Sequence, residues 1–189
     1  SVNLSIAQGS RIGPSLYIIH ESDLRTLSLS NLVMKYADDT NLLVPCCTDV
    51  EIDQEFLNVQ DWAKRNKMTL NLTKTKEIIF RRPSARRSLV LPPLLPLVER
   101  VRSAKLLSVF ITDTLKFNEH VNYVLKQSCQ RLYLLKLLRA QGLPLHQLHT
   151  VCVAMLISRK MYAICARGGF CAVAEVNRIN SFLKRLDIY

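Results

Sequence analysis

The sequence predicts an α+β fold in which short strands come first and an all-helical region follows. Two short apolar, β-prone runs, 32–34 and 41–44, flank the polar segment 35–40, as in a β-hairpin. Proline and arginine are concentrated in 81–97, and helical periodicity dominates from residue 117 onward. Hydrophobic residues make up 49% of the 189 residues, which is enough for a sizeable core.

The first segment, 1–7, alternates roughly between polar and apolar residues and is predicted to form a strand. A glycine-containing turn, 8–14, leads into a helix that Ser10 is placed to cap. Gly9 and Gly13 allow a ligand or another backbone to approach closely, although the Gly-Lys-Ser/Thr ending of a phosphate-binding loop is absent. The apolar face expected for this helix comprises Ile12, Leu16, Ile19 and Leu24.

Asp38 and Asp39 are predicted to lie at or beside the turn of the hairpin, held out by its two strands. Adjacent carboxylates repel each other, so each prefers solvent or a counter-ion. Because oxygen ligands suit Mg²⁺, this tip is a candidate site for a hard cation. Asp and Asn also favour turns for local reasons, so an ordinary turn is the alternative that these residues alone leave open.

A helix is expected from about 49 to 67, because Thr48 and Glu51 have the spacing of a capping box. The apolar positions at helical spacing are Ile52, Phe56, Val59, Gln60 and Ala63, with Trp62 nearby. Glu77–Phe80 is a strand candidate. A second hairpin is predicted from 98–101 and 105–111, with 102–104 as its turn.

Three helices are predicted in the remaining chain. The face of the first, which reaches about residue 140, comprises Phe117, Val121, Val124, Ser128, Leu132 and Leu135. Gly142 is expected to end it, and Pro144 to begin a second helix of about 144–166 that stops at the glycines 168–169. The third helix, 171–186, is expected to turn inward Val173, Val176, Ile179 and Leu183.

The six cysteines include no Cys-x-x-Cys pair, and the four histidines do not supply zinc spacing beside them. Cys129, Cys152 and Cys165 fall within apolar helical patterns, so we expect buried free thiols in a reducing compartment. No run of about 18 apolar residues is present, and no basic-then-apolar leader, so neither a membrane-spanning helix nor a secretory signal is expected. We expect further chain of the same unit to precede Ser1.

The net charge of +11 is unevenly distributed. Residues 1–50 carry three Lys/Arg against five Asp/Glu, whereas residues 51–189 carry 23 against 10. Within the second part, 64–105 has twelve basic residues and only two acidic ones. An acidic tip beside a strongly basic body suits a polyanion that must approach a metal site, and a solvated basic face without a partner is the alternative.

Four blocks of the sequence resemble a known family. They are AQGSRIGPSLYIIHESDL, KYADDTNLLV, WAKRNKMTLNLTKTKEIIF and KLLSVFITDTLKFNEHV, in that order. Together they resemble the second half of the reverse transcriptase domain of non-LTR (LINE-type) retrotransposons, and the resemblance covers nearly the whole chain. It implies a truncated right-hand polymerase palm over 1–97, a primer-grip-like hairpin over 98–115, and an all-helical thumb-like region over 116–189.

The resemblance also implies roles for individual residues in two-metal nucleotidyl transfer with Mg²⁺ or Mn²⁺. Asp38 would be a metal ligand with Asp39 as its acidic neighbour, and one of two lysines would sit near the departing pyrophosphate. The implied catalytic set is Asp38, Asp39, Lys74 and Lys76. The implied nucleotide- and template-binding set is Gln8, Gly9, Ser10, Gly13, Pro14, Tyr36 and Ala37.

The partners that the resemblance implies are an RNA template, a DNA primer or RNA–DNA duplex, and dNTP, without a membrane and with nuclear and cytoplasmic localisation. The chain departs from the family in several places. The family's other essential Asp, on an upstream strand, is not among these residues, Ser108 replaces a usual Gly, and 167–170 replaces a usual Trp-Gly pair. We therefore expect this piece to be inactive by itself. The alternative function is a non-catalytic nucleic-acid-binding remnant that uses 64–105 and the helical tail.

Overall fold

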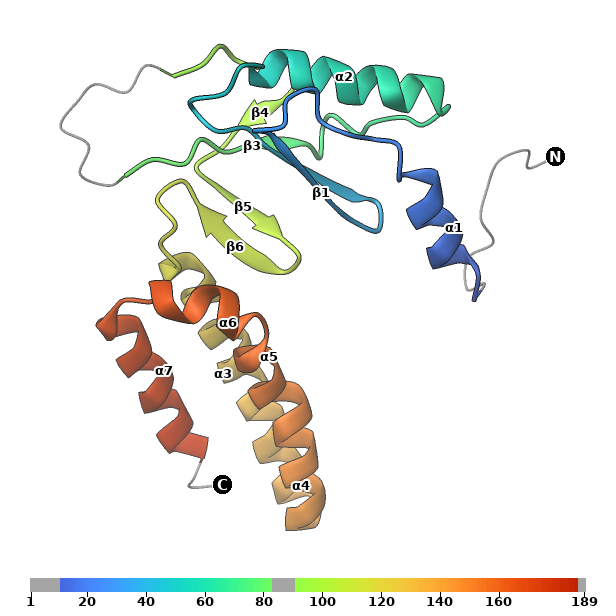
Figure 1. Cartoon of the computed structure of the whole chain (residues 1–189). Coiled ribbons are helices and arrows are strands. Elements are labelled where there is room, and N and C mark those ends of the chain that lie inside the picture. Colours follow the sequence, from blue (N-terminus) through green and yellow to red (C-terminus); the bar gives the residue numbers. More distant parts are fainter. Residues whose placement is uncertain (1–10, 83–90, 187–189) are drawn as a thin grey trace. The chain divides into compact units, whose positions relative to one another are not determined.

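The computed structural model describes residues 11–82 and 91–186 and confirms an α+β chain of small hairpins and several helices (Figure 1). By its contacts the chain divides into a first unit, Ser1–Leu72, and a second unit, Thr73–Tyr189, which are described separately. The sequence places its best internal boundary later, at 81–97. The division into palm, primer-grip hairpin and thumb stays a prediction, and the strand predicted over 1–7 lies outside the described residues.

The first unit is built on a hairpin and two helices, and their bounds are α1 Gly13–His20, β1 Leu32–Tyr36, β2 Asp39–Leu43 and α2 Ile52–Arg65. β1 and β2 pair antiparallel, with Leu32 opposite Leu43 and Tyr36 opposite Asp39. Leu24, Val59, Trp62 and Ala63 form the buried cluster of this unit, with Val33, Met68 and Leu70 packed against it. The predicted hairpin and the apolar face of α2 are therefore confirmed in outline.

A buried carboxylate joins the two loops that flank the hairpin. Glu55 of α2 is fully buried and accepts hydrogen bonds from the backbone N–H groups of Leu27 and Ser28, at 2.9–3.0 Å, and from the Asn31 amide at 2.8 Å. The Asn31 amide also donates to the Val50 carbonyl oxygen at 2.9 Å. The loop entering β1 and the loop leaving β2 are thus held by one side chain and its neighbour.

The start of α2 differs from the predicted capping box. The helix begins at Ile52 with Glu51 as its N-cap residue, and no side chain caps it. The Thr48 hydroxyl instead donates to the Asn31 side-chain oxygen at 2.7 Å and accepts from the Val50 N–H at 3.3 Å. Thr48 is recruited by the loop network around Glu55, so its spacing to Glu51 does not mark the helix start.

The predicted inward face of α1 is wrong. Ile12, Leu16 and Ile19 are exposed, whereas Leu24, which lies in the loop after α1, is buried against α2. Ile12 is the N-cap residue of the helix, and Ser10, the predicted cap, lies outside the described residues. The apolar cluster of this unit takes its residues from the loop and from α2, and the described side chains of α1 are not among them.

The second unit begins with two small sheets and continues with helices. The strands are β3 Lys76–Glu77, β4 Glu99–Arg100, β5 Ser103–Leu106 and β6 Val109–Thr112. The helical elements are α3 Asn118–Ala140, α4 Leu145–Cys152, the π-helical turn η1 Val153–Ile157, α5 Ser158–Met161, α6 Ile164–Arg167, the 3₁₀ turn η2 Gly168–Phe170 and α7 Val173–Leu186. β3 and β4 pair in parallel, and β5 and β6 form an antiparallel hairpin. The strand predicted over 77–80 therefore shifts to 76–77.

The second hairpin forms, but its predicted turn at 102–104 is wrong. β5 already begins at Ser103, and the two-residue turn consists of Leu107 and Ser108, whose φ angles are +44° and +69°. A two-residue hairpin turn with two positive φ angles usually carries Asn or Gly, and Leu-Ser gives no such signal. Glu99 and Arg100, predicted as part of this hairpin, pair with β3 instead.

The face predicted for α3 is confirmed. Phe117 is buried, and within the helix the buried residues are His120, Val121, Val124, Ser128, Leu132 and Leu135. The helix ends at Ala140, and Gly142, just beyond the C-cap residue, has φ +85°. The Gly142 N–H donates to the Arg139 carbonyl at 3.0 Å and the Leu143 N–H to the Leu138 carbonyl at 3.1 Å. These two bonds are the Schellman pattern, which explains why glycine stands at this position.

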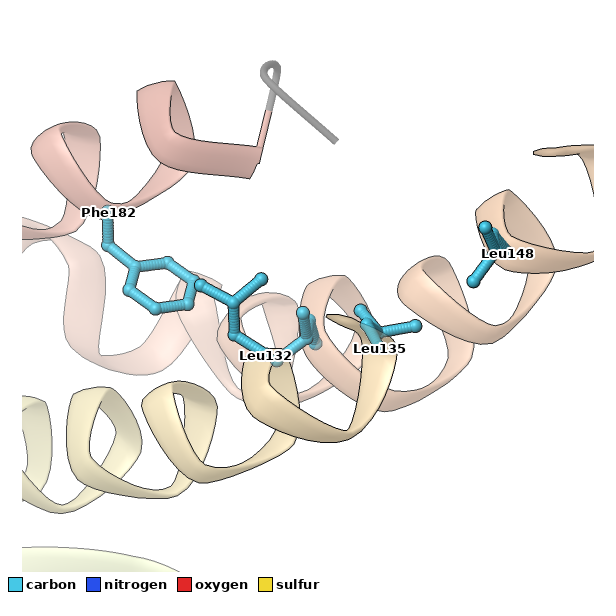
Figure 2. Packing of buried hydrophobic residues seen from close by; sticks show 5 residues of the cluster. Leu132, Leu135, Leu148 and Phe182 are labelled. Carbon is cyan, nitrogen blue, oxygen red and sulfur yellow. The ribbon is translucent and has the colours of Figure 1, made fainter. Parts of the chain in front are cut away.

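α3 packs against α4 and α7, and Figure 2 shows the side chains that converge there. The buried cluster comprises Leu132, Leu135, Leu148, Leu156 and Phe182. Phe182 is fully buried, whereas Val173 and Val176 are exposed and Ile179 and Leu183 are half-buried, so the inward face predicted for α7 is wrong. The ring of Phe182 fills this interface, so the buried face of α7 is centred on Phe182 and not on the smaller apolar side chains.

The second predicted helix is continuous only over 145–161. Tyr162 has an extended ψ of 127° and Ala163 a φ of +52°, and together they break the helix before α6. The stretch Leu145–Phe170 has the length and composition to cross a membrane, and 17% of its apolar 18-residue window is buried. A core helix meets the same criterion, and 17 continuous helical residues span only about 25 Å of a bilayer core of about 30 Å.

None of the three cysteines predicted to be buried is fully buried. Cys129 and Cys165 are exposed, and Cys152 is half-buried. Cys129 stands one residue beyond Ser128 on α3, which turns it off the buried face, and Cys165 lies in the short helix after the break. Their apolar sequence surroundings therefore do not place them in the interior.

The Glu55→Gln variant tests the loop network. The amide would present a donor to backbone N–H groups that now meet a carboxylate oxygen, so we expect unfolding to cost about 2 kcal/mol less. Burial raises the pKa of Glu55, but the bonds from Asn31, Ser28 and Leu27 outweigh it and hold this pKa below its ordinary value. The carboxylate's contribution is therefore complete above about pH 4.3 and is lost as pH falls through the lowered pKa.

Urea denaturation of the full chain followed by Trp62 fluorescence measures this effect, because Trp62 is the single tryptophan and lies in the buried cluster of the first unit. Asp61→Asn, an exposed carboxylate on the same helix, is the matched control. The account fails if Glu55→Gln and Asp61→Asn have equal midpoints at pH 7, or if the difference between them grows as the pH is lowered to 3.

Candidate functional site

Two carboxylates occupy the end of the hairpin in the first unit. Ala37 and Asp38 form its two-residue turn, and Asp39 is the first residue of β2, paired with Tyr36. Ala37 has a φ of +51°, so the turn reverses the chain within two residues. Both carboxylates are exposed, and neither forms an ion pair within residues 11–82 and 91–186. The pair crowns two paired strands, as the sequence predicts.

The negative charge of the tip reaches a tyrosine of α1. Burial is the main cause that raises the pKa of Tyr17 well above its usual value, followed by a hydrogen bond to Glu21 and the charge of Glu21. The charges of Asp38 and Asp39 add to the same shift. The phenol therefore stays protonated and keeps its hydrogen bond to Glu21.

Lys35, the cation closest in sequence to Asp38 and Asp39, stabilises the fold of the first unit. Lys35 donates through Nζ to the carbonyl oxygens of Glu21 and of Leu24, the latter at 2.9 Å, and so ties β1 to the loop after α1. Burial lowers the pKa of this ammonium, although the nearby charges of Glu21 and Asp23 oppose that shift. Because Lys35 is bound to backbone carbonyls, the charge of the two carboxylates remains available to an external cation.

The donor set at the tip fits a hard cation that arrives with other ligands. Carboxylate oxygens are the ligands that Mg²⁺ and Mn²⁺ prefer, and Mg²⁺ is commonly held by one or two carboxylates together with substrate phosphates. In the described part of the chain no group of three or more His, Cys, Asp or Glu side chains could hold a metal ion. Asp38 and Asp39 therefore supply a partial site, and phosphate or water oxygens would complete it.

The residues predicted for the site that are not in the hairpin come from other segments of the chain. Gln8, Gly9 and Ser10 lie outside the described residues, and Gly13 and Pro14 form the first turn of α1. Lys74 and Lys76 belong to the second unit, so their place relative to the tip stays a prediction. Lys76 pairs with Glu99 across the parallel strands β3 and β4.

A basic cavity between α3 and α7, in the second unit, was not predicted. Its volume is about 600 Å³, and its described lining combines cations, amides and a hydroxyl without any carboxylate; the polar lining residues are Asn122, Lys126, Asn177, Arg178, Ser181 and Arg185. Arg178 and Arg185 are seven residues apart, two turns along one face of α7. The spacing of the two arginines is visible in the sequence, but the position of Lys126 beside them depends on the packing of α3 against α7.

A buried lysine lies beside this cavity. The Nζ atom of Lys160 is 3.4 Å from the centre of the Phe182 ring and has no hydrogen-bond partner among the described residues. Burial lowers the pKa of Lys160 to about 8, against an opposing effect of Cys129 and Cys152. The neighbouring Arg167 is also buried and donates to the carbonyl oxygens of Lys160 and Tyr162 at the helix break. These two cations support the bend between α5 and α6.

Comparisons with models of known protein families, with curated proteins and with solved structures returned no match. The functional assignment therefore rests on the sequence blocks and on the geometry of the hairpin tip.

Divalent-ion binding at the tip is open to a direct test. We expect Mn²⁺ binding by the full chain, followed by electron paramagnetic resonance of the free ion, to weaken at least about tenfold in the Asp38→Asn/Asp39→Asn double variant, because it loses both oxygen anions. Asp53→Asn/Asp61→Asn removes the same charge from exposed positions of α2 and serves as control. Equal weakening in the two double variants would mean that the ion responds only to net charge.

Proposed function

We propose that this chain is part of an RNA-directed DNA polymerase, a reverse transcriptase of the non-LTR retrotransposon kind. The observation that carries the proposal is the exposed pair Asp38 and Asp39 at the end of a tight hairpin. The order of the four sequence blocks around that hairpin supports it. The substrates would be an RNA template, a DNA primer and dNTP, in the nucleus and the cytoplasm.

Nucleotidyl transfer depends mainly on positioning and on neutralising phosphate charge. Bound Mg²⁺ or Mn²⁺ would supply positive charge against the phosphates. The two-residue turn would hold the Asp38 and Asp39 oxygens in a fixed relation to each other. The exposed ring of Tyr36, at the last position of β1, would offer an apolar surface beside the primer terminus, and the small side chain of Ala37 leaves space there.

The lysine proposed near the departing pyrophosphate has a competing partner. Lys76 pairs with Glu99, and both side chains retain access to solvent. A role of Lys76 toward pyrophosphate therefore requires phosphate oxygens to replace the Glu99 carboxylate, an exchange that is inexpensive for an exposed ion pair. Lys74, two residues earlier, is the other candidate for the same role.

The second unit would bind the nucleic-acid backbone. The cavity between α3 and α7 presents Lys126, Arg178 and Arg185 with amide and hydroxyl donors, all suited to phosphate oxygens. Such contacts position a duplex without reading its sequence, as a polymerase that copies any template requires. The excess of basic over acidic residues in 51–189 points the same way.

We propose further that the 189 residues do not extend a primer by themselves. Two-metal chemistry needs carboxylates from more than one strand. In the described residues no third His, Cys, Asp or Glu joins Asp38 and Asp39 in a group that could hold a metal ion, and the other aspartate that the resemblance implies is not in this sequence. Activity would reside in a longer parent protein.

The second candidate function is a non-catalytic nucleic-acid-binding remnant. It is favoured by the same basic cavity, which needs no metal to bind a duplex, together with the incomplete carboxylate set at the tip. The two candidates agree on duplex binding and disagree on synthesis. The gene upstream separates them, since an open frame that encodes the further aspartate favours the polymerase, whereas stop codons or frameshifts favour the remnant.

Binding of an RNA–DNA duplex, measured by fluorescence anisotropy across a salt series, tests the duplex binding that both candidate functions predict. Removing a cation that neutralises one phosphate reduces the slope of log K against log salt by about 0.9. We expect Lys126→Ala/Arg178→Ala/Arg185→Ala to reduce that slope by about 2–3. Arg11→Ala/Arg25→Ala removes two exposed cations of the first unit that lie outside 64–105, and we expect it to change the slope by less than one. Equal slopes for the triple and the double variant would remove the cavity from the binding surface.

Primer extension on an RNA template, with Mg²⁺ or Mn²⁺, tests the catalytic part. We expect no incorporation by the 189-residue chain, and incorporation by the longer parent that Asp38→Asn abolishes. Incorporation by the chain alone that Asp38→Asn removes would contradict the proposed division of activity. An active parent that tolerates Asp38→Asn would contradict the assignment of the site.

A further inference from the structure

Two neighbouring thiols in the first unit take no part in the proposed site. Cys46 and Cys47 follow β2 directly after Pro45, both are exposed, and their sulfur atoms lie 3.7 Å apart, within hydrogen-bond distance for sulfur. Elsewhere in the described chain, no two other cysteine sulfurs make such a contact. This pair therefore differs in chemistry from the four remaining thiols.

Cys46 and Cys47 are poorly placed to form a disulfide with each other. Adjacent Cα atoms across a trans peptide are about 3.8 Å apart, whereas disulfide-bonded cysteines usually have Cα atoms about 4.4–6.8 Å apart. The described chain has no cis peptide bond that would change this separation. The two sulfurs are thus held near each other by the backbone but are not well placed to bond to each other.

Their separation instead suits two bonds to one intervening atom. With sulfur bonds of about 2.3 Å, as in zinc–thiolate sites, sulfurs 3.7 Å apart subtend an angle of about 107° at the bound atom. That angle is close to tetrahedral, so the thiols can chelate without a change of backbone.

Among the described residues, the two cysteines are the only ligands found there. The nearest carboxylate in sequence, Asp49, accepts a hydrogen bond from the Ser28 hydroxyl, and this bond is the main cause that lowers its pKa. No described group of three His, Cys, Asp or Glu side chains could enclose a metal ion. A closed four-ligand zinc site is therefore not formed, and the pair suits a centre that needs only two protein sulfurs.

We propose that Cys46 and Cys47 form a two-thiolate chelating site for one soft, thiophilic metal or metalloid centre, whose other positions are filled by ligands from solution. Thiolate sulfur selects soft centres and does not suit Mg²⁺ or Mn²⁺, so this site is chemically separate from the carboxylate tip. The hydrogen bond to Cys46 raises the pKa of the Cys47 thiol.

Phenylarsine oxide is the probe that tests this site. Two As–S bonds form, the two thiol protons and the oxo group leave as one water molecule, and no atom changes oxidation state. The fully reduced chain is titrated with the probe, and bound arsenic is counted by intact mass while free thiols are counted by a chromogenic reagent. We expect one arsenic per chain and a fall from six free thiols to four.

Single substitutions make the assignment specific. Cys46→Ser and Cys47→Ser are each expected to weaken binding at least about 100-fold, because either one converts chelation into a single bond. Cys129→Ser and Cys165→Ser remove exposed isolated thiols and are expected to leave the affinity unchanged. Trp62 fluorescence checks that each variant is folded. Retention of the two-thiol adduct in Cys46→Ser, or its loss in Cys165→Ser, would overturn the proposal.

Discussion

The carboxylate of Glu55 is the interaction on which the first unit depends. An isolated two-stranded hairpin is marginal in water, and β1 and β2 have no third strand in the described chain. Glu55, fully buried, binds the loop that enters β1 through Leu27, Ser28 and Asn31, and Asn31 binds the loop that leaves β2. Buried charge is costly unless hydrogen bonds satisfy it, and here backbone and amide donors do so without a cation.

This arrangement has a consequence for the hairpin tip. Glu55 is satisfied by neutral donors, and the ammonium of Lys35 is bound by backbone carbonyl oxygens. Lys35 therefore does not pair with Asp38 or Asp39, and these two exposed carboxylates have no ion-pair partner among the described residues. The repulsion between Asp38 and Asp39 is then relieved only by solvent or a bound ion. A tight turn that tolerates this repulsion at its end, fixed at its base by a buried network, is a reasonable means of holding a divalent cation against phosphate.

Periodicity and turn chemistry predicted those elements whose signal is local. The buried face of α3, its end just before Gly142 and the hairpin around Asp38 follow from residue spacing and turn residues alone. Glu55 was missed because a glutamate on a helix ordinarily faces water, and only the loops folded over it reveal its role. The turn at Leu107–Ser108 and the choice of Phe182 over smaller apolar residues were missed because each is decided by packing and backbone conformation that leave no pattern in the sequence.

The most direct test of the central claim is the position of a bound divalent ion on the folded chain. Paramagnetic Mn²⁺ broadens the amide resonances nearest to it, so a ¹⁵N–¹H spectrum recorded during a Mn²⁺ titration maps the site by residue. The account predicts that the amides of Tyr36, Ala37, Asp38, Asp39 and Thr40 broaden first. Broadening that begins around other exposed carboxylates, such as Glu51 or Glu119, while the tip resonances stay sharp, would contradict it.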